Sequence, residues 1–99
     1  MPYFDKIIKL YPDFAHGYDN RGWAKIKMGN LDEGLADVNH SLTLEPTNAD
    51  AYRNIGLYHL KKGDARTAKE LLEKAKAMNP DTPLIDDYLA EANNLPAII

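Results

Sequence analysis

A 34-residue repetition is the feature of this sequence that most restricts its fold. When residues 15–48 are written above residues 49–82, seven columns carry the same amino acid. A fixed period of this length indicates stacked copies of one supersecondary unit, because each copy can bury its apolar face only against its neighbours. The shared positions are Ala15/Ala49, Tyr18/Tyr52, Asn20/Asn54, Gly22/Gly56, Lys27/Lys61, Gly29/Gly63 and Pro46/Pro80.

The repeated glycines mark a turn between two helices in each unit. Gly29 and Gly63 each follow a helical pattern, where a left-handed stop favours a residue without a Cβ atom. Asn30 and Asp64 come next and can cap a second helix, and Asn30 with Glu33 has the spacing of a capping box. Each unit is therefore predicted to be two helices joined by a tight turn.

The repeated prolines mark the end of the second helix. Pro46 and Pro80 lack an amide donor and disfavour helical geometry in the residue before them. Asn48 and Thr82 can then cap the next helix, and Pro83 suits its first turn.

The register continues beyond the two complete units. Pro12 lies one full period before Pro46, so the chain opens on a second helix without its partner, and residues 83–93 form a first helix without a second. A content of 44% hydrophobic and 27% charged residues is that of one ordinary globular domain. We predict an all-α chain with about six helices, near residues 2–10, 14–28, 31–44, 49–62, 65–78 and 83–93.

The turn and closing motifs resemble those of tetratricopeptide-repeat (TPR) proteins. The first unit has Y-D-N-R-G, G-N-L-D-E-G and L-E-P, and the second has Y-R-N-I-G, K-G-D-A-R-T-A and M-N-P. This resemblance implies a right-handed superhelical α-solenoid of antiparallel helix pairs in a single domain over residues 1–99. Its expected parts are a half repeat (1–12), two repeats (15–48 and 49–82), a C-terminal capping helix (83–94) and an apolar tail (95–99).

Four positions depart from the TPR pattern. Arg21 stands where a large aliphatic residue is usual, Lys25 and His59 where an aromatic is usual, and Gly34 where alanine is usual. We expect these departures to change local packing and not the fold. Pentatricopeptide repeats, which bind RNA, have a similar length, but the Gly-Asn/Asp turn and the closing proline favour TPR.

The TPR resemblance implies a protein–protein interaction scaffold that binds a peptide or partner segment in a concave groove. The first helix of each pair lines that groove, and helical spacing identifies the side chains that face it. The predicted groove residues are Asp19, Trp23, Ile26, Lys27, Asp50, Arg53, Asn54, Leu57, Leu60, Lys61, Leu84, Asp87 and Glu91.

Trp23 is the residue we single out within the groove. Together with Leu57, Ile26 and Leu60 it is predicted to form an apolar strip on the groove floor, so we expect a partner with apolar side chains. Large aromatics often dominate interface energies. The alternative interpretation is that Trp23 is a half-buried packing residue, because tryptophan is seldom fully exposed.

One TPR subclass holds the C-terminal carboxylate of heat-shock chaperones through lysine, asparagine and arginine side chains. At the corresponding positions this chain has Asp19 and Trp23, then Asn54, then Leu84 and Tyr88. Only Asn54 matches, at a position where asparagine is frequent in TPRs generally. The motif therefore does not indicate binding of a chaperone tail.

The sequence lacks the residue patterns of catalytic and metal sites. There is no cysteine, which excludes disulfides, thiolate zinc sites and cysteine nucleophiles. His16, His40 and His59 are scattered over three helices with no close-spaced ligand set. We therefore expect no metal, no cofactor and no enzymatic activity.

Charge and hydropathy bear on the partner class and the compartment. The net charge is −3, and residues 81–99 carry four acidic side chains and no base, so we expect no binding to nucleic acid. No apolar run approaches the roughly 18 residues that span a bilayer, so we expect no membrane insertion. A leader could have been removed, and of the two compartments that suit a cysteine-free chain we expect the cytoplasm before the periplasm.

Apolar residues at both ends support an alternative function. They are Tyr3, Phe4, Ile7, Ile8, Leu10 and Tyr11 at the start, and Leu95, Pro96, Ala97, Ile98 and Ile99 at the end. Exposed apolar ends indicate either a segment of a longer protein or contacts between copies. The alternative to partner binding is thus a self-association module, for example a homodimer.

Overall fold

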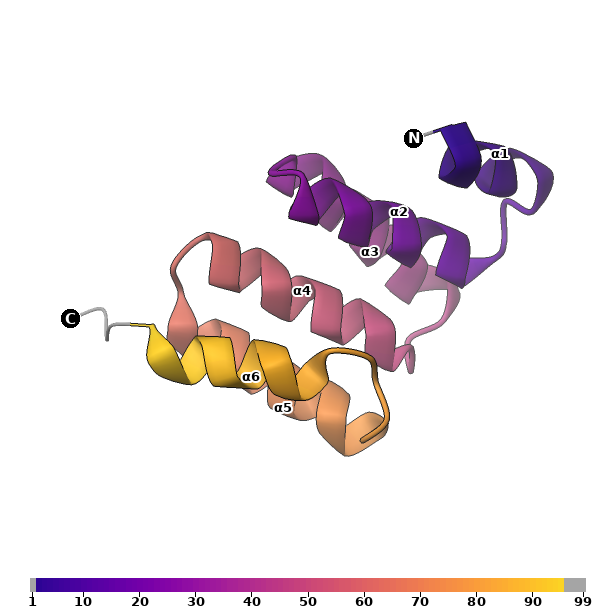
Figure 1. Ribbon diagram of the computed structural model, residues 1–99. Helices are drawn as coiled ribbons and strands as arrows, with labels where there is room; N and C mark the ends of the chain where they lie inside the picture. Colours follow the sequence, from indigo (N-terminus) through magenta and orange to yellow (C-terminus); the bar gives the residue numbers. More distant parts are fainter. Residues whose placement is uncertain (1, 96–99) are drawn as a thin grey trace.

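The computed structural model describes residues 2–95 of the chain, and these residues form six α-helices and no strand (Figure 1). The predicted all-α fold is confirmed, and most helix ends lie within one residue of their predicted places. Of the predicted apolar tail, only Leu95 belongs to the described residues. The helices are α1 (Pro2–Leu10), α2 (Ala15–Lys27), α3 (Leu31–Leu44), α4 (Ala49–Lys61), α5 (Ala65–Met78) and α6 (Ile85–Asn94).

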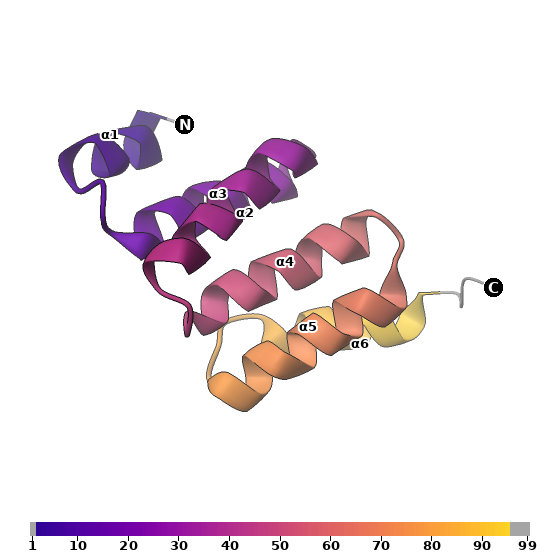
Figure 2. The ribbon, with the colours of Figure 1, turned by 180° about the vertical axis from the view of Figure 1, so that it is seen from behind.

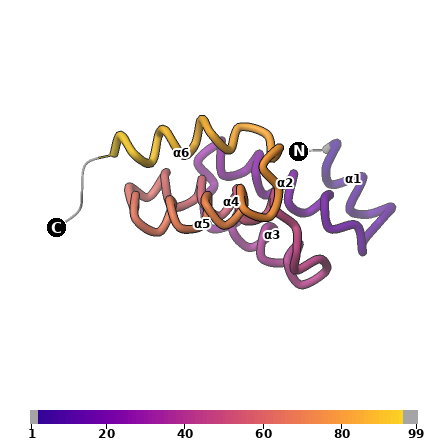
Figure 3. Tube along the Cα trace, turned by 90° about the horizontal axis from the view of Figure 1, so that it is seen from below, coloured from indigo at the N-terminus to yellow at the C-terminus, as the bar shows by residue number. Residues whose placement is uncertain are grey.

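The helices stack in a regular order along an elongated body of 44 × 26 × 19 Å. Helix α2 pairs with α3 and α4 pairs with α5, and each second helix also packs on the next first helix (Figures 1 and 2). Helix α1 packs on α2 in the same way. Among the first helices, α4 adjoins both α2 and α6, and α1 and the end of α6 lie at opposite ends of the array (Figure 3).

The two predicted glycine stops are confirmed, and the caps are confirmed in part. Gly29 and Gly63 have φ angles of 92° and 78°, in the left-handed region. The Asp64 carboxylate accepts a hydrogen bond from the Thr67 amide at 3.2 Å, which holds the pKa of Asp64 below its usual value. Asn30 makes no side-chain cap bond, so the predicted capping box is wrong. The first turn of α3 is held there by the backbone, because the Gly34 amide donates a 3.0 Å hydrogen bond to the Asn30 carbonyl.

Helix α6 begins at Ile85, two residues later than predicted. Leu84 has a φ angle of 63°, so the chain is left-handed immediately before the helix. The hydroxyl of Thr82 donates to the Asn79 carbonyl at 2.7 Å and does not cap the helix. The Pro83 carbonyl accepts a 3.2 Å hydrogen bond from buried Arg53 on α4. This tertiary bond holds Pro83 outside the helix that its sequence favours.

The unusual glycine at position 34 is explained by a close approach of α2 and α3. A Cβ atom on Gly34 would lie 2.7 Å from the Gly22 carbonyl oxygen and 2.6 Å from Cγ1 of Ile26. A Cβ on Gly22 would lie 2.6 Å from Cγ2 of Val38. All three distances are shorter than real Cβ atoms show, so this crossing favours glycine on both helices.

The polar departures at positions 21 and 25 are explained by a shared carboxylate on α3. Arg21 donates from Nε and Nη2 to the two oxygens of Asp37, at 2.8 and 2.7 Å, and Lys25 lies 3.2 Å from the same carboxylate. Arg21 also contacts Asp5 of α1 at 2.9 Å. Burial alone would raise the pKa of Asp37, but the bonds from Arg21 and Lys25 outweigh burial and hold that pKa below its usual value. Charged bonds thus connect α1, α2 and α3.

Candidate peptide-binding groove

The thirteen predicted groove residues all belong to α2, α4 and α6 or to the residue preceding α6, but they differ in exposure. Trp23 and Asp50 are half-buried. The exposed residues are Lys27, Lys61, Leu84, Asp87 and Glu91. The buried residues are Asp19, Ile26, Arg53, Asn54, Leu57 and Leu60.

The predicted apolar strip on the groove floor is wrong. Ile26, Leu57 and Leu60 have exposed fractions of 0%, 3% and 8%, and they belong to the hydrophobic core together with Val38 and Leu72. They are buried because other helices cover each first helix on several sides: α2 contacts α1, α3 and α4, and α4 contacts α2, α3, α5 and α6. Of the four strip residues, only Trp23 retains partial exposure.

Trp23 contacts two cations and a hydroxyl group through its indole ring. Lys27 Nζ lies 4.0 Å from the ring centroid and Arg53 Cζ lies 3.8 Å from it, both within cation–π range. The indole Nε1 donates a 3.1 Å hydrogen bond to the hydroxyl of Tyr88 on α6. Trp23 is therefore a half-buried side chain that connects α2 to α4 and α6, with Lys27 on its outer side.

Arg53 is the buried cation beneath this ring. Its side chain is 1% exposed, and Nε and Nη2 donate to Oδ1 of Asn54 at 3.0 and 2.9 Å. The carboxylate of Asp50 lies 3.8 Å away. Burial lowers the pKa of Arg53, and the nearby negative groups oppose that shift. Arg53 and Asn54 are thus engaged inside the protein.

Asp19 belongs to a second buried polar cluster that sequence reasoning assigned to the groove surface. Its Oδ2 accepts a hydrogen bond from Asn48 and lies 3.2 Å from His16 Nδ1. Asn54 Nδ2 donates to the Asp19 carbonyl at 3.0 Å. Within the part of the chain described, the other carboxylate oxygen, Oδ1, has no partner. Burial raises the pKa of Asp19 above its usual value.

Tyr88 and Asn48 are the site residues that sequence reasoning left out of the groove set. Tyr88 lies one full period after Asn54, so the repeat register already places it in a groove-lining column. Asn48 was predicted only as a helix cap, which it is, since its Oδ1 accepts from the Asp50 amide at 3.1 Å. Its second role, as a donor to Asp19 and Ser41, depends on a tertiary contact that spacing does not encode.

The exposed positive and negative side chains of the predicted groove lie on different helices. Lys27 at the end of α2 and Lys61 at the end of α4 occupy the same column of the repeat, whereas Asp87 and Glu91 lie on α6. The inner face therefore has a basic region next to an acidic one. Among residues 2–95, no cluster of histidine and carboxylate side chains is arranged to hold a metal ion, and no helix there is long and apolar enough to cross a membrane.

Comparison with known proteins identifies the family. The family model described as "Tetratricopeptide repeat" matches residues 15–48 and 49–82. The Hsp70-Hsp90 organizing protein of Triticum aestivum is 32% identical over 95 residues, which are 96% of this chain and 16% of that protein. The SGT1 homolog of Oryza sativa subsp. japonica is 34% identical over 70 residues, which are 71% of this chain and 19% of that protein.

A solved structure has the same fold. The structure titled "TPR2B-domain:pHsp70-complex of yeast Sti1" superposes with a TM-score of 0.76 at 24% sequence identity, covering 94% of this chain and 79% of that one. This chain spans less than a fifth of the two curated relatives. The six helices, the repeat register and the matches over both repeats show that the chain belongs to the tetratricopeptide-repeat family.

Proposed function

We propose that this TPR domain is a protein-interaction scaffold that binds an extended segment of a partner protein along the inner faces of α2, α4 and α6. The observation that carries the proposal is the contact of α4 with both α2 and α6, with exposed charges on all three helices and Trp23 held by Lys27 and Tyr88. A surface already rigid before binding loses little conformational entropy when a ligand binds.

The exposed side chains favour a charged ligand over an apolar one. Ile26, Leu57 and Leu60 are buried, and the accessible groups are the ammonium groups of Lys27 and Lys61 and the carboxylates of α6. Complementary charges would set the direction and the register of the ligand. We therefore propose a segment with acidic residues against α2 and α4 and a basic residue against α6.

The ligand is held differently from a chaperone tail in a carboxylate clamp. One relative is named for organizing Hsp70 and Hsp90, and the solved structure is titled as a complex with a pHsp70 peptide. In this chain the corresponding positions include Asp19 and Asn54, which are both 0% exposed and hydrogen-bonded to other groups. A clamp at these positions would require breaking the buried cluster.

The experiment is a selection of peptides followed by titration. A random peptide library is selected against the wild-type domain, and binding of the enriched peptides is followed by the fluorescence of Trp23, which is the only tryptophan of the chain. The test variant is Lys27→Glu with Lys61→Glu. The matched control is Lys6→Glu with Lys9→Glu, which makes the same charge change on α1, outside the groove.

We expect enriched peptides to be acidic and to bind the test variant at least about tenfold more weakly, equivalent to about 1.4 kcal/mol. The control variant should bind as the wild type does. Equal loss in both variants would show a nonspecific charge effect, and unchanged binding in the test variant would place the ligand elsewhere. An Hsp70 C-terminal peptide serves as a second probe, and tight binding by it would refute the proposed difference from a carboxylate clamp.

A further inference from the structure

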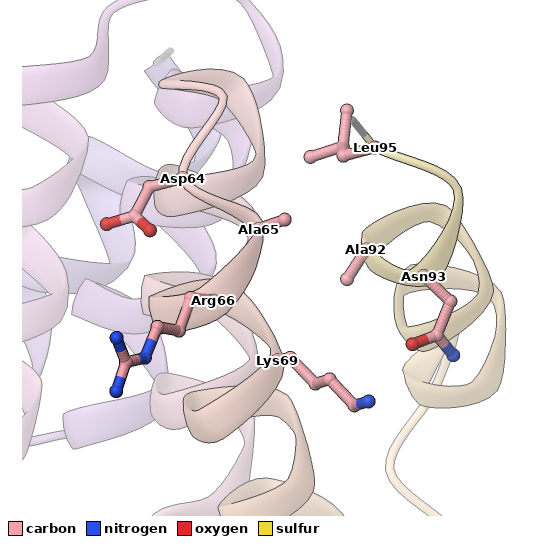
Figure 4. Close-up of a pocket in the computed structure, with 7 residues that line it drawn as sticks. All are labelled: Asp64, Ala65, Arg66, Lys69, Ala92, Asn93 and Leu95. Atoms are coloured by element: carbon pink, nitrogen blue, oxygen red, sulfur yellow. The ribbon is translucent and has the colours of Figure 1, made fainter. Parts of the chain in front are cut away.

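A concave surface lies between the start of α5 and the end of α6 (Figure 4). It has a volume of about 730 Å³ and includes none of the thirteen groove residues. Its apolar part is formed by half-buried Ala65 of α5, half-buried Leu95 directly after α6, and Ala92, which is 4% exposed. Arg66 and Lys69 of α5 also line it. We call this surface the α5–α6 cleft.

The repeat register shows why the α5–α6 cleft is open. The preceding layer has an equivalent contact between the start of α3 and the end of α4. There, one period earlier in the sequence, Leu31 and Tyr58 occupy the columns of Ala65 and Ala92. Leu31 and Tyr58 are half-buried and pack against the hydrophobic core. The cleft therefore has alanine at two columns where the preceding layer has large side chains.

A third column changes from apolar to charged. Leu35 of α3 is half-buried, and one period later the same column holds Lys69, which is exposed. Arg66 also lines the cleft, but its 92% exposed side chain extends away from α6, and its Nε lies 3.9 Å from the Glu70 carboxylate (Figure 4). Asp64 lines the cleft as well, and its carboxylate, which accepts from the Thr67 amide, stays charged on the same side of α5 as Arg66 (Figure 4). The cleft thus combines apolar side chains with one cation, Lys69, that points toward α6.

We propose that the α5–α6 cleft is a second protein-interaction site, which receives a leucine- or tyrosine-sized side chain of a partner protein flanked by carboxylates. The size of the side chain follows from Leu31 and Tyr58 at the equivalent columns. The flanking charge follows from Lys69, with Arg66 adding to the positive charge at this end of α5. The site is independent of the groove, so its test can fail while the groove proposal holds, and the converse is also true.

The test uses three short peptides and nuclear magnetic resonance. The probe is an acetylated and amidated peptide of sequence EDLYDE, and the controls are EDAADE, without the large apolar side chains, and KKLYKK, without the carboxylates. Each is titrated into the ¹⁵N-labelled full chain. We expect EDLYDE to shift the amide signals of Ala65, Lys69, Ala92 and Leu95, and we expect the controls to shift them at least about tenfold less at equal concentration.

Two variants assign the binding to the cleft. Ala65→Leu with Ala92→Tyr restores the side chains of the equivalent layer and should abolish the shifts while circular dichroism shows retained helix. Arg66→Glu with Lys69→Glu should weaken binding at least about tenfold, whereas Lys6→Glu with Lys9→Glu should leave it unchanged. Retained binding in the filled variant would overturn the proposal, as would an absence of shifts at millimolar EDLYDE.

Two other occupants are separated by the same signals. If the chain's own residues 96–99 fill the cleft, a version ending at Leu95 would bind EDLYDE while the wild type would not, which would overturn the proposal of a partner. If a second copy fills the cleft, the signals of Ala65 and Ala92 would shift on dilution of the protein alone, with a fall in mass by light scattering. That outcome would also overturn it.

Discussion

Replacing Gly34 by alanine tests how closely α2 and α3 must pack. The two repeats provide an internal measure, because position 34 in the first repeat corresponds to Ala68 in the second. A Cβ on Gly22 would lie 2.7 Å from the carbonyl oxygen of Gly34, whereas a Cβ on Gly56 would lie 3.5 Å from that of Ala68. The distance from the Cβ to the carbonyl oxygen is therefore about 0.8 Å shorter in the first repeat (3.5 minus 2.7). The two helices of the first repeat pack more closely at this crossing.

Two opposing effects determine the result of Gly34→Ala. Alanine raises intrinsic helix stability by about 1 kcal/mol relative to glycine. The new Cβ would lie 2.7 Å from a backbone oxygen and 3.0 Å from the backbone nitrogen of Ile26, and backbone atoms cannot turn away as a side chain can. Overpacking of this kind costs about 1–3 kcal/mol. Separation of the helices also strains the two short bonds between Arg21 and Asp37.

We expect Gly34→Ala to lower the free energy of unfolding by about 1 kcal/mol, although alanine is the usual TPR residue at this position. The measurement is urea unfolding followed by circular dichroism, where a slope of about 1–3 kcal/mol per molar makes this change a midpoint shift of about 0.5 M. The matched control is Ala68→Gly, which should destabilise through helix propensity and loss of a buried methyl group. A Gly34→Ala variant more stable than wild type would refute the reasoning.

Four further expectations follow from the same structure. Gly29→Ala should destabilise by about 1–2 kcal/mol in urea, because its φ of 92° brings the new Cβ close to the neighbouring backbone, although more distant described residues place no atom within 4 Å of it; an unchanged midpoint would contradict this. Asp37→Asn should remove a stabilisation of the folded state that is present above the ordinary pKa of 3.8. Because that stabilisation is lost as the pH falls through the lowered pKa of the folded state, the free energies of unfolding of wild type and variant should converge in acid. Asp19→Asn should behave oppositely: because burial raises the pKa of Asp19, the wild type should gain stability relative to the variant as the pH falls from neutral toward 3.8, and a parallel pH dependence would count against the burial effect. Tyr88→Phe should cost about 0.5–1.5 kcal/mol and shift the indole N–H resonance of Trp23, since that group loses its acceptor; an unmoved resonance would exclude the bond in solution.

The fold could be predicted from the sequence because the 34-residue period and the glycines and prolines at the helix ends indicate the same helices. The period fixed the number of helices, and Gly29, Gly63, Pro46 and Pro80 fixed their ends to within one residue in most cases. The exception was the start of α6, where the Arg53 bond to the Pro83 carbonyl overrides local preference. That bond joins residues 30 positions apart, so no local pattern reveals it.

The groove could be predicted only in part, because spacing assigns a residue to a helix face but does not give its exposure. Ile26 and Leu57 lie on the first helices as predicted, yet neighbouring helices cover them. Burial of Asp19 and Arg53 was also beyond the sequence, since charged residues are rarely buried unless partners from other helices satisfy them. Asn48, which donates to Asp19, and the Pro83 carbonyl, which accepts from Arg53, lie far along the chain from these residues and become their neighbours only after folding.

The bond between Trp23 and Tyr88 has a consequence for how the domain unfolds. In most solenoids each repeat contacts only the next, so energy is coupled between nearest neighbours and terminal units can melt separately. Here the first repeat is bonded directly to α6, 65 residues away, past the second repeat. The loss of α6 therefore weakens the first repeat as well as the second, which favours a single all-or-none transition over melting from the C-terminal end.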